Sequence, residues 1–305
     1  MRYIKNLLDP DTSSMNSQGF KPNYLILLLR FISKIIIRIL RLNGRTRWSN
    51  EFIQSIDPMI EIEVPSLNAS KKKNKIWFRT GHGRLYWRTR HTHDLEPETN
   101  EWIKSFNKSD VFYDIGANIG FYSLLASKFM RSKTYSFEPD LMNARLLYEN
   151  IIRNNVSDLV TLIPIALSNK NYCANLFLST LSYGDALHNL DSKNSIIKGG
   201  SAGNINIPAF TLDSIVNQLE MKYPTKIKID VDGIELKILQ GANKVLDAAS
   251  EILVEWELNS DTKEKITKIL TNKSFNFQWE SKIHNSYANT VNAFFKKNEN
   301  KKYNK

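Results

Sequence analysis

Apolar residues between 110 and 295 are grouped in the way that a sheet with intervening helices produces. Short β-prone runs occupy 111–115, 134–138, 160–165, 226–230 and 251–256, and segments with helical character separate them. Runs at 275–279 and 290–295 predict the last two strands. This alternation predicts an α/β fold with a parallel, doubly wound sheet. The glycine-containing stretch 175–210 is expected to form an irregular lid with a short strand pair.

The turn after the first strand carries the strongest chemical signal. It reads Asp114-Ile-Gly-Ala-Asn-Ile-Gly120, and Glu138 ends the next strand. We expect Gly116 to let the backbone turn sharply and approach a ligand, and Gly120 to let the following helix pack closely on the strand. Glu138 is placed to accept hydrogen bonds from two ribose hydroxyls. The pattern therefore predicts a nucleotide-type cofactor site.

Two residues in this turn separate the candidate cofactors. A dinucleotide fingerprint has glycine where this chain has Asn118. The Asp114 carboxylate would repel a diphosphate but could hold the ammonium group of an amino acid. These features favour S-adenosylmethionine over NAD, and the alternative interpretation is an ordinary buried strand–turn–helix segment.

A second acidic site follows the run Lys226-Ile-Lys-Ile-Asp230. Ligands of open α/β sheets bind at the carboxyl ends of strands, so Asp230 could orient a substrate, deprotonate a hydroxyl or help to hold a cation. Asp232 shares this functional interpretation, and a turn or helix-cap role is the alternative for both. Apolar positions from 234 to 246 predict one helix with a single buried face.

The chain from about 98 to 257 resembles the FkbM-type methyltransferases. The motifs that carry the resemblance are the turn Asp114–Gly120 together with Phe137-Glu-Pro139, Thr211-Leu-Asp213, Lys228-Ile-Asp-Val-Asp-Gly-Ile-Glu235 and Gly241-Ala242. That family usually has Asp-Val-Glu-Gly where this chain has Asp230-Val-Asp-Gly233. The resemblance implies a Rossmann-like class I methyltransferase sheet with an antiparallel last strand. It also implies that Asp114, Gly116, Asn118 and Gly120 line the methionine end of S-adenosylmethionine and that Glu138 binds the ribose.

Methyl transfer to a hydroxyl also requires a base, and histidine is the usual choice. The chain has five histidines, of which His188 lies in the expected lid. His188 is either a catalytic or substrate contact or a surface residue of a mobile loop. His91 and His93 form an H-x-H pair without an evident third ligand, so we predict a solvated strand pair there and no metal site.

Basic residues are concentrated outside the central region of the chain. Residues 1–109 hold 19 Lys/Arg and 10 Asp/Glu, whereas the central region is slightly acidic, which argues against nucleic acid as the substrate. Within 24–42, Arg30, Lys34, Arg38 and Arg41 form one stripe on an otherwise apolar helix. This pattern favours either an in-plane helix on an anionic membrane or packing on protein over a membrane-spanning helix. The single cysteine, Cys173, excludes an intrachain disulfide.

We therefore expect a helical segment at 1–43, an accessory α+β region at 44–109, a methyltransferase domain at 110–295 and a disordered basic tail at 296–305. Strands at 61–64, 76–78 and 84–88 are expected in the accessory region, which could bind substrate or form a homodimer contact. The expected activity is O-methylation of a sugar hydroxyl in a surface glycan or a lipid-linked precursor. Methylation of a polyketide or other secondary metabolite is the alternative, and an NAD-dependent oxidoreductase or a non-catalytic adenosyl-binding protein are rival classes. The expected location is cytoplasmic, with peripheral binding to the inner face of the membrane.

Overall fold

The computed structural model describes residues 28, 31–33, 35–36, 59–64, 74–79, 85, 89, 96–179, 189–191, 202–258, 261–282 and 290–298. The chain divides into two units, residues 1–57 and 58–305. In the first unit the described residues between 28 and 36 are helical, which agrees with the pattern over 24–42. The larger unit holds the sheet, the hairpin before it and the cavity discussed below. The domain boundaries expected from the sequence stay predictions.

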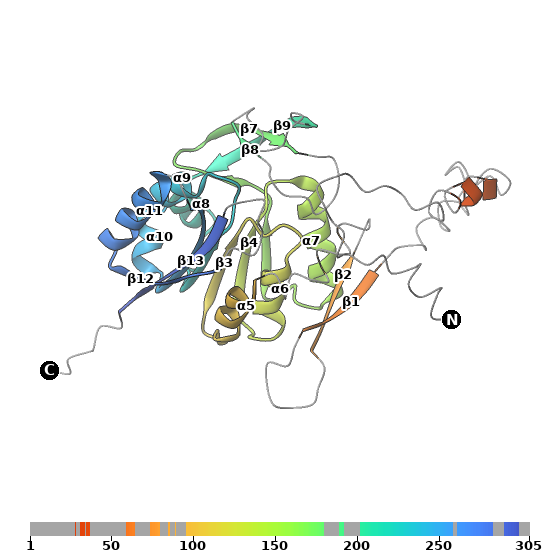
Figure 1. Ribbon diagram of the computed structural model, residues 1–305, viewed down its shortest axis with the longest axis horizontal. Helices are drawn as coiled ribbons and strands as arrows, with labels where there is room; N and C mark the ends of the chain where they lie inside the picture. Colours follow the sequence, from red (N-terminus) through yellow and green to blue (C-terminus); the bar gives the residue numbers. More distant parts are fainter. Residues whose placement is uncertain are drawn as a thin grey trace. The chain divides into compact units, whose positions relative to one another are not determined.

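The main sheet has seven strands in the order β12-β13-β11-β10-β3-β4-β5 (Figure 1). Strands β11, β10, β3, β4 and β5 are parallel neighbours, whereas β13 runs antiparallel to both β11 and β12. The seven strands lie close to the predicted ranges, and their bounds are β3 Val111–Ile115, β4 Lys133–Phe137, β5 Val160–Ile163, β10 Lys226–Ile229, β11 Glu251–Glu257, β12 Phe275–Glu280 and β13 Thr290–Lys297. The expected parallel sheet with an antiparallel last strand is confirmed. Strand β13 continues to Lys297, two residues into the segment expected as a disordered tail.

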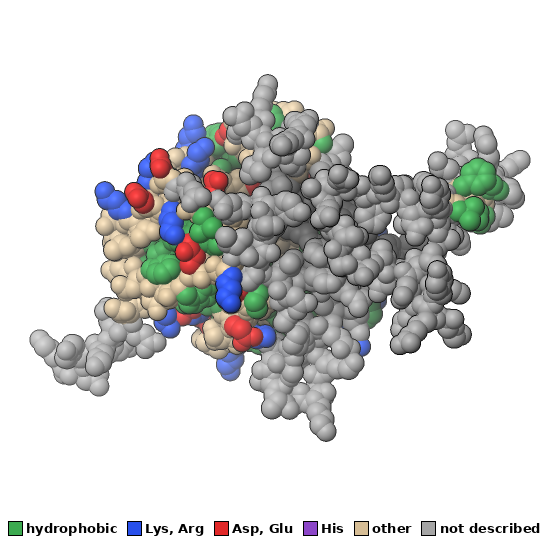
Figure 2. Space-filling view, in the orientation of Figure 1, with side chains coloured by type: hydrophobic (Ala, Val, Ile, Leu, Met, Phe, Trp, Pro, Cys, Tyr) green, Lys and Arg blue, Asp and Glu red, His purple; other side chains and the backbone are tan. Residues whose placement is uncertain are grey.

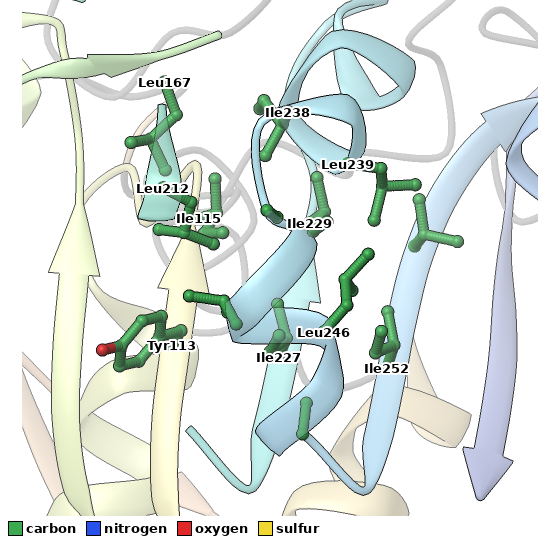
Figure 3. Packing of buried hydrophobic residues seen from close by; sticks show 14 of the residues in the cluster. Tyr113, Ile115, Leu167, Leu212, Ile227, Ile229, Ile238, Leu239, Leu246 and Ile252 are labelled. Atoms are coloured by element: carbon green, nitrogen blue, oxygen red, sulfur yellow. The ribbon is translucent and has the colours of Figure 1, made fainter. Parts of the chain in front are cut away.

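Helices cover both faces of this sheet. One apolar cluster joins it to α5 (Pro97–Lys104), α6 (Phe121–Lys128) and α7 (Leu141–Arg153). The other cluster joins it to α8 (Leu212–Gln218), α9 (Glu235–Gln240), α10 (Asn243–Ala248) and α11 (Asp261–Asn272). Figure 3 shows Tyr113, Ile227 and Ile252 of the strands facing Leu246 and its neighbours in this second cluster. The two clusters make the sheet doubly wound.

A smaller sheet extends beyond the end of β5. It contains β6 (Ala166–Leu167), β7 (Tyr172–Leu178), β8 (Asn189–Leu190) and β9 (Gly203–Phe210), in the order β6-β9-β7-β8. Strands β7 and β9 pair antiparallel along their whole length and bury a cluster of their own that includes Leu176 and Ile207. The expected irregular lid is therefore an ordered sheet in its described part.

Strands β1 (Met59–Val64) and β2 (Asn74–Arg79) form the antiparallel hairpin predicted around the Lys-rich turn. The backbone of β2 is held on α7 by two asparagines one helical turn apart: Asn150 accepts from the Arg79 amide at 2.9 Å, and Asn154 accepts from the Trp77 amide at 3.0 Å. The expected strand at 84–88 is wrong at Leu85, which is helical and fully buried in the same cluster as α5 and α6.

The single helix predicted through 235–246 is divided into α9 and α10 at Gly241. A Cβ atom at Gly241 would lie 2.4 Å from the carbonyl oxygen of Ser168, so only glycine fits where this turn meets the chain after β6. The apolar period continues across the break because both helices bury the same side, and for this reason the pattern predicts one helix.

Candidate functional site

A cavity of about 200 Å³ lies at the carboxyl ends of β3, β4 and β10. This edge of the sheet is where ligands bind in open α/β folds. The lining combines the glycine turn, acidic side chains and an apolar end contributed partly by the smaller sheet. The residues used below are Glu96, Gly116, Asn118, Tyr122, Glu138, Ile165, Leu176, Leu190, Asp230 and Asp232.

The turn after β3 has a left-handed backbone that glycine favours. Gly116, Asn118 and Gly120 all have positive φ angles, of 85°, 50° and 89°. A Cβ atom at Gly116 would lie 1.9 Å from the Asp230 carbonyl oxygen, so the glycine lets the two loops touch. At Gly120 the conflict is with Leu147 of α7 at 2.1 Å, which corrects the expectation that this glycine serves helix-to-strand packing.

Glu138 lies directly after β4 and is held by backbone amides on both sides. Its Oε2 accepts from the Asn118 amide at 2.7 Å, and its Oε1 accepts from the Asp140 amide at 2.9 Å. The side chain is only 5% exposed but lines the cavity. These bonds fix the carboxylate at the edge of the glycine turn, where the sequence predicts a ribose acceptor.

Asp114 is buried behind the turn and does not belong to the cavity lining. Its Oδ2 accepts from the Ser123 hydroxyl at 2.5 Å, and Ser123 is in turn 2.7 Å from the Ser136 hydroxyl. Burial raises the pKa of Asp114, and the positive charge of Lys228 opposes that rise. The geometry gives Asp114 a role in holding α6 on β3, and direct contact with a cofactor stays a prediction.

Lys228 and Asp230 form an ion pair at the end of β10. The Lys228 ammonium lies 2.5 Å from Asp230 Oδ2 and 4.7 Å from the centre of the Tyr122 ring. Burial alone would lower the pKa of Lys228, but the charges of Asp230, Glu96 and Asp114 hold it above its usual range. Asp230 is about one-third exposed and lines the cavity, so a charged pair connects the cavity with the core.

Sequence reasoning missed Lys228 itself and the residues that surround its pair with Asp230, which are Glu96, Tyr122, Glu255 and Asn292. Glu96 Oε2 accepts from the Asn292 amide nitrogen at 2.9 Å, and Glu255 accepts from the Thr290 hydroxyl at 2.9 Å. The register places Glu255 opposite Asn292, on the sheet face that Lys228 also occupies. Burial, followed by the charge of Asp230, raises the pKa of Glu255 well above its usual range.

The remaining candidates divide between the cavity and the helix that follows it. Asp232 lines the cavity beside Asp230. Glu235 is buried at the start of α9, where its carboxylate accepts from the Gly233 amide at 3.1 Å, and burial raises its pKa to about 8. His188, like His91 and His93, lies outside the described residues, so its role stays a prediction.

Within the described segments, no group of three or more His, Cys, Asp or Glu side chains has the arrangement of a metal site. In the same part of the chain, no helix has the length and apolar character needed to cross a membrane.

Comparison with known proteins identifies a family whose model matches this chain. A model described as "Methyltransferase FkbM domain" matches residues 114–294. The hexuronic acid methyltransferase AglP of Haloferax volcanii is 24% identical over 185 residues, which are 61% of this chain and 71% of that protein. A tRNA (guanine(37)-N(1))-methyltransferase of Dictyostelium discoideum is 26% identical over 144 residues, 46% of this chain but only 30% of its own length.

Among solved structures, the FkbM methyltransferase of Methylobacillus flagellatus is similar with a TM-score of 0.47 at 16% identity. That likeness covers 69% of this chain and about half, 51%, of the solved chain. The family model alone spans more than half of the sequence and includes the glycine turn, Glu138 and the Lys228–Asp230 pair. The chain therefore belongs to the FkbM methyltransferase family.

Proposed function

We propose that the chain transfers the methyl group of S-adenosylmethionine to a hydroxyl of a sugar, in a surface glycan or its lipid-linked precursor. The observation that carries the proposal is one cavity that brings together the glycine turn, Glu138 and Asp230. Family membership supports methyl transfer, and the similarity to a protein called a hexuronic acid methyltransferase supports a sugar acceptor. A polyketide or other secondary-metabolite hydroxyl is the alternative acceptor.

The cavity has the donor set that an adenosyl cofactor needs. Gly116 and Asn118 present backbone at the turn, and Glu138 presents an oriented carboxylate to which ribose hydroxyls can donate. Ile165, Leu176 and Leu190 give the cavity an apolar end suited to a flat base. When bound, the cofactor supplies a methyl group on a positively charged sulfur.

The residues of the chain would then align the acceptor and exclude water, which are the main tasks in a displacement at carbon. Asp230 is the side chain we assign to the acceptor hydroxyl, because it lines the cavity and is held by Lys228 at 2.5 Å. It would orient this hydroxyl and receive its proton, with Asp232 next to it as a second contact.

Two rival activities fit the cavity less well. A nicotinamide dinucleotide would bring a diphosphate to a turn that has Asn118 where a dinucleotide fingerprint has glycine. A nucleic acid would need a cationic track for its phosphates, whereas Figure 2 shows Lys and Arg interspersed with Asp and Glu among the described residues of the face that it draws. The relatives that act on tRNA therefore do not change the proposal.

Calorimetric titration of the purified chain with S-adenosylhomocysteine, NAD and NADP is the first test. We expect binding of S-adenosylhomocysteine alone. The second test incubates the protein and labelled S-adenosylmethionine with glycans from a strain that lacks its gene, and we expect label in sugar. Binding of a nicotinamide cofactor alone would refute the reaction class, and saturable cofactor binding without transfer to any acceptor would favour a non-catalytic role.

We also propose that the helix within 24–42 lies on an anionic membrane surface, which would bring the enzyme to a lipid-linked acceptor. Leu28, Phe31, Ile32, Ile35 and Ile36 are 41–63% exposed, and Figure 2 shows apolar side chains on the surface of the helix drawn red-orange in Figure 1. The sequence adds Arg30, Lys34, Arg38 and Arg41 to the same segment. An exposed apolar surface accompanied by cations is typical of interfacial helices.

Sedimentation with vesicles of phosphatidylglycerol and phosphatidylcholine tests this location. We expect Phe31→Asp to release the protein, whereas Leu219→Asp, at a similarly exposed residue after α8, should leave binding unchanged. Deletion of residues 1–43 should have the same effect as Phe31→Asp. If Phe31→Asp leaves vesicle binding intact but converts a dimer to a monomer in gel filtration, the helix packs on a second copy and the membrane proposal is wrong.

A further inference from the structure

A second carboxyl group, that of Glu255, lies beside Asp230 at the same edge of the sheet. Strands β10 and β11 are parallel, and their register, continued by one position beyond its last pair, sets Asp230 next to Glu255. Lys228 pairs with Leu253, which is two positions before Glu255, so Lys228 and Glu255 share one face of the sheet. The Lys228 ammonium bonds to Asp230, which is therefore directed toward this face as well. Unlike Asp230, Glu255 does not belong to the cavity lining.

The Glu255 carboxyl group is held in place from β13. Its Oε1 accepts from the Thr290 hydroxyl at 2.9 Å, and the side chain is half-buried. The register places Asn292 opposite Glu255, and the Asn292 amide nitrogen donates to Glu96 Oε2 at 2.9 Å. Glu96 lines the cavity. Strand β13 therefore holds one carboxyl group in the cavity wall and a second one next to Asp230.

The neighbouring charges determine whether Glu255 is ionised. Burial is the largest cause that raises the pKa of Glu255, to about 9, and the negative charge of Asp230 is the next. Glu96 adds to this rise, whereas the positive charge of Lys228 opposes it. Near neutral pH, Glu255 therefore holds a proton, while Asp230 is the anion that pairs with Lys228.

From this arrangement, and resting on the proposed function, we infer that Glu255 is a positioning residue of methyl transfer, which acts through Asp230 and controls how readily Asp230 takes the proton of the acceptor. While Glu255 is uncharged, the Lys228 ammonium keeps Asp230 a weak base. Once Glu255 is charged, a second anion lies beside Asp230 and increases its affinity for a proton. The two carboxyl groups then titrate as a coupled pair.

The role of Glu255 is separate from the bonds that change in the transfer. A bond forms between the acceptor oxygen and the methyl carbon while the carbon–sulfur bond breaks, and the electron pair of the broken bond stays on sulfur, which leaves S-adenosylhomocysteine. The hydroxyl proton passes to Asp230 and from there to water. Because Glu255 changes only how strongly Asp230 attracts this proton, its effect belongs to the pH dependence of transfer and not to cofactor binding.

A cycle of variants tests the pair without requiring activity. Urea unfolding is followed at pH 6 and pH 9 for the wild type, Glu255→Gln, Asp230→Asn and the double variant, and glutamine keeps an oxygen that can accept from Thr290. The folded protein binds a proton at Glu255 that the unfolded chain releases above its ordinary pKa of 4.5, so the stability of the wild type should fall as the pH rises. Glu255→Gln should remove part of this fall, and it should remove less in the Asp230→Asn background. An equal effect in both backgrounds would overturn the pairing.

A pH profile of transfer tests the role of Glu255 in the reaction. Initial rates with labelled S-adenosylmethionine and glycan from a strain that lacks the gene are measured from pH 6 to pH 9.5. The matched control is Glu257→Gln, which changes an exposed residue two positions further along β11. We expect the rate to rise severalfold toward alkaline pH in the wild type and in Glu257→Gln, and Glu255→Gln to lose most of this rise.

The two experiments separate this inference from the proposed function. The same alkaline rise in Glu255→Gln as in the wild type would overturn the inference alone. Absence of transfer by the wild type to any glycan, with S-adenosylhomocysteine still bound, would overturn the proposed function and the role of Glu255 in it. The stability cycle would then still decide whether Asp230 and Glu255 are coupled.

Discussion

Lys228→Met should weaken both the fold and the site, because it removes the cation that balances a group of acids. Lys228 is 1% exposed and bonds to Asp230 at 2.5 Å, and the charges of Glu96 and Asp114 also act on it. Methionine fills nearly the same volume as the lysine stem, so the main change is electrostatic. Asp230 would then be an unmatched carboxylate at the end of β10.

The expected loss of stability follows from the burial of the two partners. Removing one member of a fully buried pair costs about 3–5 kcal/mol. Because Asp230 is about one-third exposed and water can solvate it, we expect about 2–4 kcal/mol for this pair. The loss should grow as the pH rises. Burial already raises the pKa of Asp114, and without Lys228 it would rise further, so the folded variant would bind a proton that the unfolded chain releases.

Urea unfolding followed by tryptophan fluorescence at pH 5 and pH 8 measures this effect. Asp230→Asn and the double variant complete a cycle, and we expect a coupling of about 1–3 kcal/mol between the two residues. Lys226→Met is the matched control, since Lys226 pairs with Glu251 near the start of the same strand, 2.8 Å apart, and lies far from the cavity lining. Both lysine variants should lose stability, but only Lys228→Met should lower the turnover of methyl transfer. Additive effects in the cycle, or equal activity of the two lysine variants, would refute the reasoning.

Three further variants test the turn, the cofactor residue and a buried acid. Gly116→Ala should unfold the protein or lower its free energy of unfolding in urea by more than about 3 kcal/mol, because the new Cβ atom would meet the Asp230 carbonyl. Gly233→Ala, which has open space around it, should lower that free energy by about 1–3 kcal/mol because of its positive φ alone. Equal losses in the two variants would contradict this explanation. Glu138→Ala should abolish S-adenosylhomocysteine binding in calorimetry while circular dichroism stays native, and unchanged affinity would remove Glu138 from the site. Burial raises the pKa of Glu235 in the folded protein to about 8 from an ordinary value of 4.5, so the stability of the wild type should fall as the pH rises between these values. Thermal melts at pH 5 and pH 8.5 should show that Glu235→Gln removes most of this fall. An equal fall in the wild type and in Glu235→Gln would contradict the explanation.

The sheet was predictable because its strands are written locally in the sequence. Each strand is a short apolar run, and the glycine turn follows the first of them, so the predicted and observed bounds of β3 are identical. Glu138 and Asp230 could be placed for the same reason, since both directly follow a strand and parallel strands end at one edge. Placing these two acids requires only the end of each strand and the knowledge that the strands are parallel. The end of a strand is visible in its own segment, and the alternation of strands and helices predicts that neighbouring strands are parallel.

The other half of the site depends on pairings between distant segments. Glu96 precedes α5 and bonds to Asn292 of β13, which is 196 positions away. Lys228 stands in an alternating run that usually places a lysine in solvent, and only the register with β3 shows that it is buried beside Asp114. Its one sequence signal is position, because it lies between two core isoleucines and two residues before Asp230.

The acids on the two sides of the cavity differ in what holds them. Glu138 is fixed by backbone amides of its own strand end and of the glycine turn. Glu96 and Asp230 are instead held by the side chains of Asn292 on β13 and Lys228 on β10. The position of Glu138 therefore depends on the backbone of the turn, whereas the positions of Glu96 and Asp230 depend on contacts with side chains.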